Sequence, residues 1–311
     1  MGWLGVLDRH ATKFLAASIF LALALPDLAA LMRPLLAPSV WGILVLAMLR
    51  TDWAALGQHV KRPRRIAAAL VWLLLACPLG LWLALRGFGM ESDGVAQAVV
   101  LMATAPPLMS TPALALIIGL DGALALVLML AAMFLAPLVL PFMTFGLLGL
   151  EIELSPWEFA ARLIFMVGSA GLAALVLRRR RGAPRVAALE KNANGIVVML
   201  MLVFAIAIMD GVTARLAADP LYVGALLAIA FLVQALLQAA TALGFLWLGR
   251  RAAFTVGFLA GNRNMGLLLA VLPTGLHPDI VLYFALAQFP IYILPALLKP
   301  LYARLIPRRS T

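Results

Sequence analysis

The chain has 311 residues, of which 65% are hydrophobic and only 12% are charged, and its mean hydropathy is +1.07. So few polar residues cannot cover a soluble globule of this size, so the composition excludes a soluble domain and indicates an integral membrane protein. The net charge of +11 would suggest a nucleic-acid partner in a soluble protein, but here it must first be compared with the preference of Lys and Arg for the cytoplasmic side of a membrane.

Apolar stretches of about 20 residues, the length that crosses a bilayer, follow one another along the chain. We predict ten transmembrane helices, at residues 13–31, 35–49, 66–85, 95–119, 122–149, 158–177, 195–214, 221–248, 253–273 and 279–303. The first resembles a signal peptide, since Arg9 and Lys13 precede it, but no clear cleavage site follows. The longest inner loop is expected at residues 178–195. The sequence therefore predicts an all-α protein with one transmembrane domain over residues 1–311.

Basic residues fall mainly on one side of these ten spans. Arg33, Arg86, Arg162 and Arg215 lie on the outer side, and Arg263 lies within the membrane. With a cytoplasmic N-terminus, 19 of the 24 Lys and Arg residues lie on the inner side: Arg9, Lys13, Arg50, Lys61, Arg62, Arg64, Arg65, Arg178, Arg179, Arg180, Arg181, Arg185, Lys191, Arg250, Arg251, Lys299, Arg304, Arg308 and Arg309. We therefore predict a multi-pass protein of a bacterial inner membrane with both termini cytoplasmic. Topology accounts for the basic excess, so no nucleic-acid partner is expected, although anionic membrane lipid is a compatible one.

The fourth and ninth predicted spans are both interrupted. Gly261-Asn262-Arg263-Asn264-Met265-Gly266 lies in the middle of span nine, where Gly and Asn are poor helix formers. Arg263 is placed near the membrane midplane, where a charge costs at least about 2.5 to 3.5 kcal/mol and normally faces a polar cavity or a partner. Span four contains Pro106, Pro107 and Pro112, and a proline costs about 3 kcal/mol inside a regular helix.

These interruptions fall at matching places in the two halves of the chain. Five spans in each half give residues 1–150 and 151–311 opposite orientations, as in transporters built from inverted repeats. Broken helices at corresponding positions of such repeats indicate the substrate site of a secondary transporter. We therefore predict two inverted five-helix repeats with the site at the two breaks.

The pattern resembles the bile acid:sodium symporter family, which is grouped with arsenite and auxin carriers among ten-span transporters. The likeness is carried by three stretches: Pro106-Pro107-Leu108 with Thr111-Pro112, then Leu120-Asp121-Gly122-Ala123-Leu124 with the later Ala136-Pro137, and the run from Leu259 to Leu267. The resemblance implies unwound helices four and nine that cross at the membrane centre. It also implies alternating access, in which a core of spans three to five and eight to ten moves against a panel of spans one, two, six and seven.

The residues at the family's sodium positions differ in this chain. Where the family has oxygen ligands, this chain has Thr111, Pro112, Ala125, Met129, Leu259 and Arg263. Alanine, methionine and leucine side chains offer no oxygen to sodium, and an arginine repels it. We therefore expect both sodium sites to be absent and coupling to run through protons or exchange. An ordinary sodium-coupled anion symporter is the alternative.

Arg263 permanently supplies the positive charge that bound sodium would supply, and its donors suit a carboxylate, sulfonate or phosphate. We predict a site for a small or medium organic anion, with added partial charge from helix N-termini at the breaks. The predicted substrate-binding residues are Gly261, Asn262, Arg263, Asn264, Pro106, Pro107, Ser110, Thr111, Gln234 and Gln238. Asp27 and Asp210 are candidates for proton coupling.

Each of these residues also has a purely structural interpretation. Arg263 would then be neutralised by carbonyls of the broken helix and would serve packing alone. Gln234 and Gln238, four apart on one helical face, would join helices by hydrogen bonds. Asp27 and Asp210 would be capped acids at the membrane interface.

Other functional classes find less support in the sequence. His10, His59 and His277 lie in loops or tails without metal-binding spacing, and no paired carboxylates or nucleophile with a base point to an enzyme. We expect no metal and no cofactor beyond a coupling ion, and the single cysteine, Cys77, is expected in the core. A channel would need a polar ring or carbonyl filter. A non-transporting sensor or scaffold is the stronger rival, and a homodimer is left open.

Overall fold

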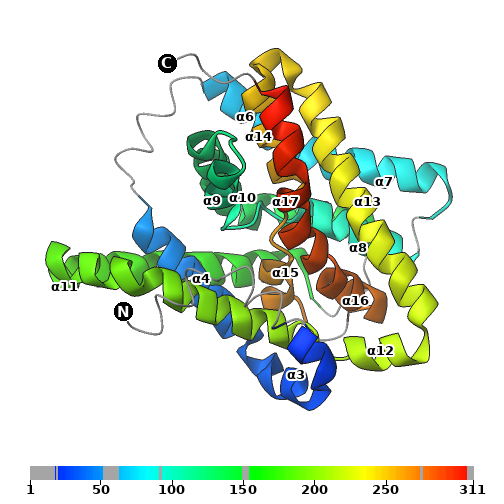
Figure 1. The fold of residues 1–311 in the computed structure, drawn as a ribbon, viewed down its shortest axis with the longest axis horizontal. Helices are drawn as coiled ribbons and strands as arrows, with labels where there is room; N and C mark the ends of the chain where they lie inside the picture. The colour runs from blue at the N-terminus through cyan, green and yellow to red at the C-terminus, as the bar shows by residue number, and fades with distance from the viewer. Residues whose placement is uncertain are drawn as a thin grey trace. The chain divides into compact units, whose positions relative to one another are not determined.

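The computed structural model describes residues 18, 20–51, 63–90, 93–148, 154–273 and 276–306, without the side chains of 181–194. The regular secondary structure of these residues is helical, and they form no strand beyond one isolated bridge. The helices are α3 (Pro26–Met32), η1 (Arg33–Leu35), α4 (Leu36–Arg50), α6 (Pro63–Val71), η2 (Trp72–Ala76), α7 (Cys77–Gly87), α8 (Gly94–Thr104), α9 (Thr111–Ile117), α10 (Gly122–Leu148), α11 (Pro156–Ala207), α12 (Val212–Ala218), α13 (Pro220–Gly244), η3 (Leu246–Leu248), α14 (Arg250–Gly261), α15 (Met265–Val271), α16 (Pro278–Leu286) and α17 (Gln288–Leu305) (Figure 1).

Among the described residues, seven helical stretches are long and apolar enough to cross a membrane. They are Pro26–Arg50, Pro63–Gly87, Gly122–Leu148, Pro156–Arg180, Gly195–Ala218, Pro220–Gly244 and Pro278–Leu305. The chain is therefore a multi-pass membrane protein, as predicted. Predicted spans four and nine are not in this set because each is divided into two shorter helices, α8 with α9 and α14 with α15.

Two predicted boundaries differ from the structure. Arg33–Leu35 form a 3-10 turn that joins α3 to α4, so that Pro26–Arg50 is one candidate span where two were predicted. Pro34 stands in the first turn of this short helix, where its missing N–H breaks no helical hydrogen bond. The segment predicted as a loop at residues 178–195 separates two candidate spans, Pro156–Arg180 and Gly195–Ala218, as expected, but its backbone is helical within α11. Its Arg, Ala, Leu, Glu and Lys residues are strong helix formers, which the loop prediction underweighted.

Several predictions fall on other parts of the chain. The start of predicted span one, residues 52–62 between predicted spans two and three, and both chain termini lie outside the described residues. The predicted cytoplasmic location of the termini falls there as well.

The chain divides into two compact units, each assembled from separate segments. Unit 1 consists of Met1–Asp52, Ala161–Val223 and Gly266–Pro273. Unit 2 consists of Trp53–Ala160, Gly224–Met265 and Thr274–Thr311. Unit 1 thus holds predicted spans one, two, six and seven with the second half of span nine, and unit 2 holds the remaining spans.

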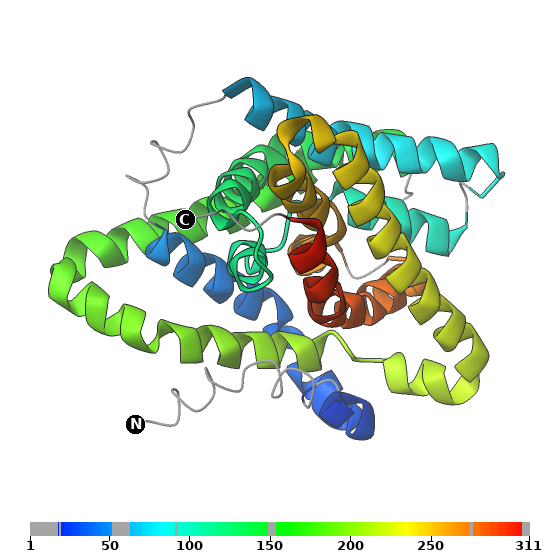
Figure 2. The same cartoon turned by 45° about the horizontal axis from the view of Figure 1, so that its top comes forward.

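Unit 1 contains α4 and most of α11. Figure 2 shows the ribbon of α11 turning back near its middle, so that it has a first arm at residues 156–180 and a second arm at residues 195–207. Helix α4 packs against both arms. Trp41 Nε1 donates to Ser169 Oγ (3.0 Å) on the first arm. Gly42 faces the second arm, where an added Cβ would lie 2.9 Å from Leu200 Cδ1. Arg178 donates to the carbonyl oxygen of Leu49 (2.8 Å) and so caps the end of α4.

Unit 2 contains α8, which packs against α7 and α16, and α14, which lies directly against α13. The α13–α14 contact is very close, because Gly257 and Gly261 of α14 face α13. A Cβ added at Gly257 would lie 2.5 Å from the backbone oxygen of Gln238, and one at Gly261 would lie 2.8 Å from that of Gln234. Small residues four apart allow this approach of two membrane helices.

Candidate functional site at the helix interruptions

The two predicted interruptions are present, and they pair with each other. Ala105–Ser110 separate α8 from α9, and Asn262–Asn264 separate α14 from α15. The N–H of Leu108 donates to the carbonyl oxygen of Asn262 (2.9 Å), and the N–H of Asn264 donates to that of Pro106 (2.8 Å). Pro107 and Arg263 thereby form an antiparallel bridge within unit 2.

Arg263 lies at the centre of this pairing and is fully buried, at 0% exposure. Its Nε donates to the carbonyl oxygen of Ala260 (2.7 Å), and Nη1 donates to those of Leu73 (3.0 Å) and Ala105 (2.9 Å). Its Nη2 contacts Cys77 Sγ at 3.6 Å. The guanidinium therefore joins α14, the third predicted span and the end of α8.

The carbonyl of Leu73 is available because of a proline in the same span. η2 is a π-helix, in which each N–H bonds to the carbonyl five residues earlier, as that of Cys77 bonds to Trp72. The corresponding donor for Leu73 would be Pro78, which has no N–H. Arg263 supplies the missing donor.

The other two carbonyls are freed by the interruptions themselves. In a continuous helix Ala260 would accept from Asn264, but the N–H of Asn264 donates to Pro106. Ala105 precedes Pro106 and has an extended backbone (φ −59°, ψ 146°), as a residue before proline prefers, so its carbonyl turns out of α8. Arg263 thus satisfies one acceptor from each of three helix irregularities.

The guanidinium charge of Arg263 has no acidic partner within the part of the chain that the structure describes. The three carbonyl dipoles stabilise the cation, but they carry no formal charge that would balance it. The carbonyl contacts agree with the packing interpretation of Arg263, and the described residues contain no anionic group that neutralises it.

Several predicted site residues carry buried polar atoms without a hydrogen-bond partner. The side chains of Asn262, Gln234 and Gln238 each use one end of the amide, on Phe258 (2.8 Å), Ala287 (3.0 Å) and Tyr302 (3.2 Å) respectively. The atoms left over are Asn262 Oδ1, Gln234 Oε1, Gln238 Nε2, Thr111 Oγ1 and Ser110 Oγ. Because buried polar groups are normally hydrogen-bonded, each of these atoms is a candidate contact for water, an ion or a ligand.

The other predicted residues lie in a helix contact, in the backbone pairing, in an exposed helix turn or in an ion pair. Gly261 lies in the α13–α14 contact, and the main chains of Pro106, Pro107 and Asn264 form the pairing itself. Asp27 is exposed in the first turn of α3. Asp210 accepts a 2.7 Å ion-pair hydrogen bond from Arg33.

Cys77 and the carbonyl of Leu73 belong to the site but were not predicted. Pro78 was the available signal, because a proline inside span three must release a carbonyl about one turn earlier. The sequence gives no means of identifying Arg263 as the donor to this carbonyl, because the two residues are 190 positions apart.

Thr111→Val tests whether the Thr111 hydroxyl lacks a partner in the ligand-free protein. We expect the variant to gain about 1 kcal/mol of unfolding free energy, because it removes an unsatisfied buried hydroxyl without changing the side-chain shape. Thr104→Val is the matched control, since Thr104 Oγ1 donates to the carbonyl oxygen of Leu101 (2.7 Å). Removing this satisfied hydroxyl should not raise the free energy of unfolding. Denaturant unfolding in detergent measures both. Equal destabilisation of the two variants would mean that Thr111 is satisfied.

Comparison with known proteins gave no match, either to a protein-family model or to a curated protein. The function of the chain must therefore be argued from the residues and the geometry of this site.

Proposed function

We propose that the chain is a secondary transporter that carries a small or medium organic anion by alternating access. Its ten spans would form two inverted five-helix repeats, as in bile acid:sodium symporters. The observation that carries this proposal is the pairing of two helix interruptions, one in each half of the chain, at Pro107 and Arg263. Discontinuous helices at corresponding positions are the usual place of substrate binding in such transporters.

The composition of the two units supports the proposal. Unit 1 takes spans one and two from the first half and spans six and seven from the second, while unit 2 takes most of the others. A division that draws corresponding spans from both halves is what two inverted repeats would produce. It also agrees with a panel and a core that move against each other.

The charge of Arg263 supports an anion as the substrate. A unit negative charge about 6 Å from a cation gains about 3 kcal/mol at an effective dielectric constant of about 20, so direct contact with the guanidinium is not required. The hydroxyls of Ser110 and Thr111 and the Nε2 group of Gln238 are buried donors that make no hydrogen bond to the described residues. They would hydrogen-bond the anionic group beside the carbonyl-bound cation.

Ligand-induced thermal stabilisation of the purified full-length protein tests this proposal. The protein is heated with a panel of carboxylates, sulfonates and organic phosphates, with and without sodium and at several pH values. An anion at about 100 times its Kd should add about 2.7 kcal/mol of stability without sodium. Thr111→Val should fold at least as well as the parent and bind that anion several-fold more weakly. Uptake into liposomes then measures transport and its coupling to protons or exchange.

Two results would contradict the proposal. Stabilisation by sodium alone would indicate the ordinary sodium-coupled alternative. Folded protein that neither binds nor takes up any anion would favour a non-transporting sensor or scaffold. That second candidate is supported by one observation, because each nitrogen of the Arg263 guanidinium already bonds to an atom of the protein.

A further inference from the structure

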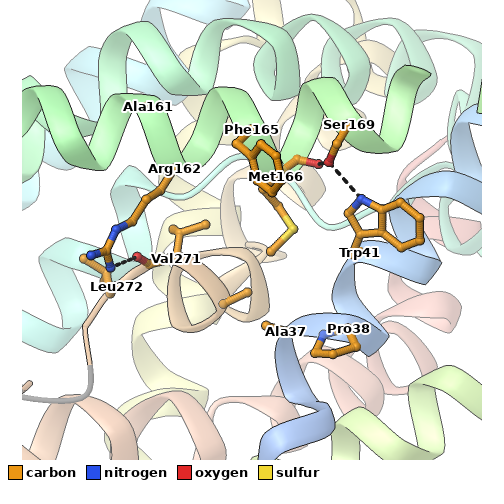
Figure 3. Close-up of a pocket in the computed structure, with 11 residues that line it drawn as sticks. Ala37, Pro38, Trp41, Ala161, Arg162, Phe165, Met166, Ser169, Val271 and Leu272 are labelled. Atoms are coloured by element: carbon orange, nitrogen blue, oxygen red, sulfur yellow. Dashed lines mark hydrogen bonds between the residues drawn. The ribbon is translucent and has the colours of Figure 1, made fainter. Parts of the chain in front are cut away.

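Unit 1 contains a separate pocket of 760 Å³ that shares no residue with the paired interruptions. It lies between α4, the first arm of α11 and the end of α15 (Figure 3). Its volume falls within the range of about 300 to 1,000 Å³ that is typical of small-molecule sites. All of its lining residues belong to unit 1, so the pocket is complete without unit 2.

The lining combines one cation with an apolar wall. Trp41, Phe165 and Met166 provide large apolar surfaces, and Phe165 is 77% exposed. The polar groups of Trp41 and Ser169 are used on each other, through the 3.0 Å bond between them. This leaves Arg162 as the charged group of the pocket.

Arg162 offers an open edge of its guanidinium to a ligand. Its Nη1 donates to the carbonyl oxygen of Val271 at the end of α15 (3.2 Å), as Figure 3 shows. Its Nε and Nη2 make no hydrogen bond to the described residues. These two nitrogens form a fork of parallel donors, the geometry that binds a carboxylate or phosphate with two hydrogen bonds.

Arg162 lies near the beginning of its helix. It is six residues after the start of α11 at Pro156, which corresponds to about 9 Å of helix. Arg side chains near the ends of membrane helices reach the level where lipid headgroups meet acyl chains. Trp41 bonds to Ser169, which is seven residues further along α11 than Arg162, so the apolar wall lies deeper in the span. An acid group at Arg162 would therefore lie at the interface, with its apolar part directed into the membrane.

We propose that this pocket binds an acidic amphipath, with the acid group on Nε and Nη2 of Arg162 and the apolar body against Trp41, Phe165 and Met166. The ligand is either a free organic acid with an apolar chain or an anionic phospholipid, which share this chemistry. The proposal does not depend on the transport function. Because Arg162 also bonds the end of α15, an occupant would add to the contacts that hold this half-helix in unit 1.

Thermal unfolding of the full-length protein in phosphatidylcholine nanodiscs tests the proposal, with dodecanoate and dodecanol as matched probes. Dodecanoate should raise the thermal midpoint of the parent, and dodecanol, which lacks the charge, should not. Arg162→Gln should weaken dodecanoate binding at least about tenfold, since charge-assisted hydrogen bonds are lost. Arg86→Gln is the control, because Arg86 is also predicted on the outer side and lies over the ring of Trp82, away from the pocket.

The source of the ligand is found by replacing part of the phosphatidylcholine with phosphatidylglycerol. If the anionic lipid raises the midpoint and prevents further stabilisation by dodecanoate, the occupant is a lipid. If dodecanoate still stabilises fully, the occupant is a free acid. Two results with the parent protein would overturn the proposal without any variant. One is equal stabilisation by dodecanoate and dodecanol, and the other is stabilisation by neither dodecanoate nor phosphatidylglycerol. An Arg162→Gln protein that folds and binds dodecanoate as tightly as the Arg86→Gln control would also overturn it.

Discussion

Arg263→Met should lower the free energy of unfolding by about 3 to 5 kcal/mol, the largest effect that we expect from one side chain in this protein. The substitution keeps an unbranched apolar stem but leaves the carbonyls of Ala260, Leu73 and Ala105 without donors. Each unsatisfied buried acceptor costs about 1 to 3 kcal/mol of stability. Removal of the buried charge avoids its desolvation penalty and so offsets part of the combined cost of the three acceptors. The loss also separates the paired interruptions from span three.

Denaturant unfolding in a mild detergent measures this effect against Arg86→Met, which should be close to neutral because Arg86 is exposed over Trp82. Arg263→Lys should retain part of the stability. Its ammonium group can serve the two carbonyls that share Nη1 but cannot also reproduce the donor at Nε. If Arg263→Met is as stable as the control, the guanidinium does not stabilise the fold through these three carbonyls.

The role of Pro78 allows a sharper check of the same contact. Pro78→Ala restores a backbone N–H in span three, so Leu73 can be satisfied without Arg263. The double variant with Arg263→Met should therefore lose less stability than the sum of the two single variants. Strict additivity would contradict a shared acceptor.

Gly257→Ala should lower the free energy of unfolding by about 2 to 3 kcal/mol, because one methyl group forces α13 and α14 apart. The added Cβ would lie 2.5 Å from the backbone oxygen of Gln238 and 3.0 Å from the Cβ of Ala242. A backbone oxygen cannot move away by a change of side-chain rotamer, so the helices themselves must shift. The displacement would pass to Gly261 and hence to the interruption that follows it.

Gly224→Ala is the matched control for this prediction, since a Cβ at Gly224 in α13 meets no atom within 4 Å. Replacing a helical glycine by alanine in open space should stabilise by about 0.5 to 1 kcal/mol. The two variants should therefore move the unfolding free energy in opposite directions when measured in the same detergent. Two effects of the same sign and size would show that the α13–α14 contact is loose.

The two interruptions were predictable because their causes are local. Pro106 and Pro107 remove backbone donors, and the Gly and Asn residues around Arg263 disfavour a helix wherever they occur. Both interruptions are where the sequence predicts them. The helical path of α11 through residues 178–195 was missed, because a cluster of charges was taken to indicate a loop although its residues favour a helix.

The partners of Arg263 were not predictable, because they are carbonyl groups and every residue has one. Only the folded chain selects Leu73 and Ala105 from many equivalent oxygens. The pocket at Arg162 was missed for a related reason. The sequence places this arginine on the outer side of the membrane, and only the packing of α4, α11 and α15 encloses a space beside it.

The bond between Arg263 and Leu73 has a consequence for biogenesis. The two residues are 190 positions apart, so at about 5 to 20 residues per second the ribosome needs about 10 to 40 s to proceed from one to the other. Throughout that interval span three carries a carbonyl that Pro78 leaves without a donor, and water or the insertion machinery has to satisfy it. The stretch Pro63–Gly87 therefore completes its hydrogen bonding only when Arg263 arrives, and a nascent chain truncated before residue 263 should remain a substrate for membrane quality control.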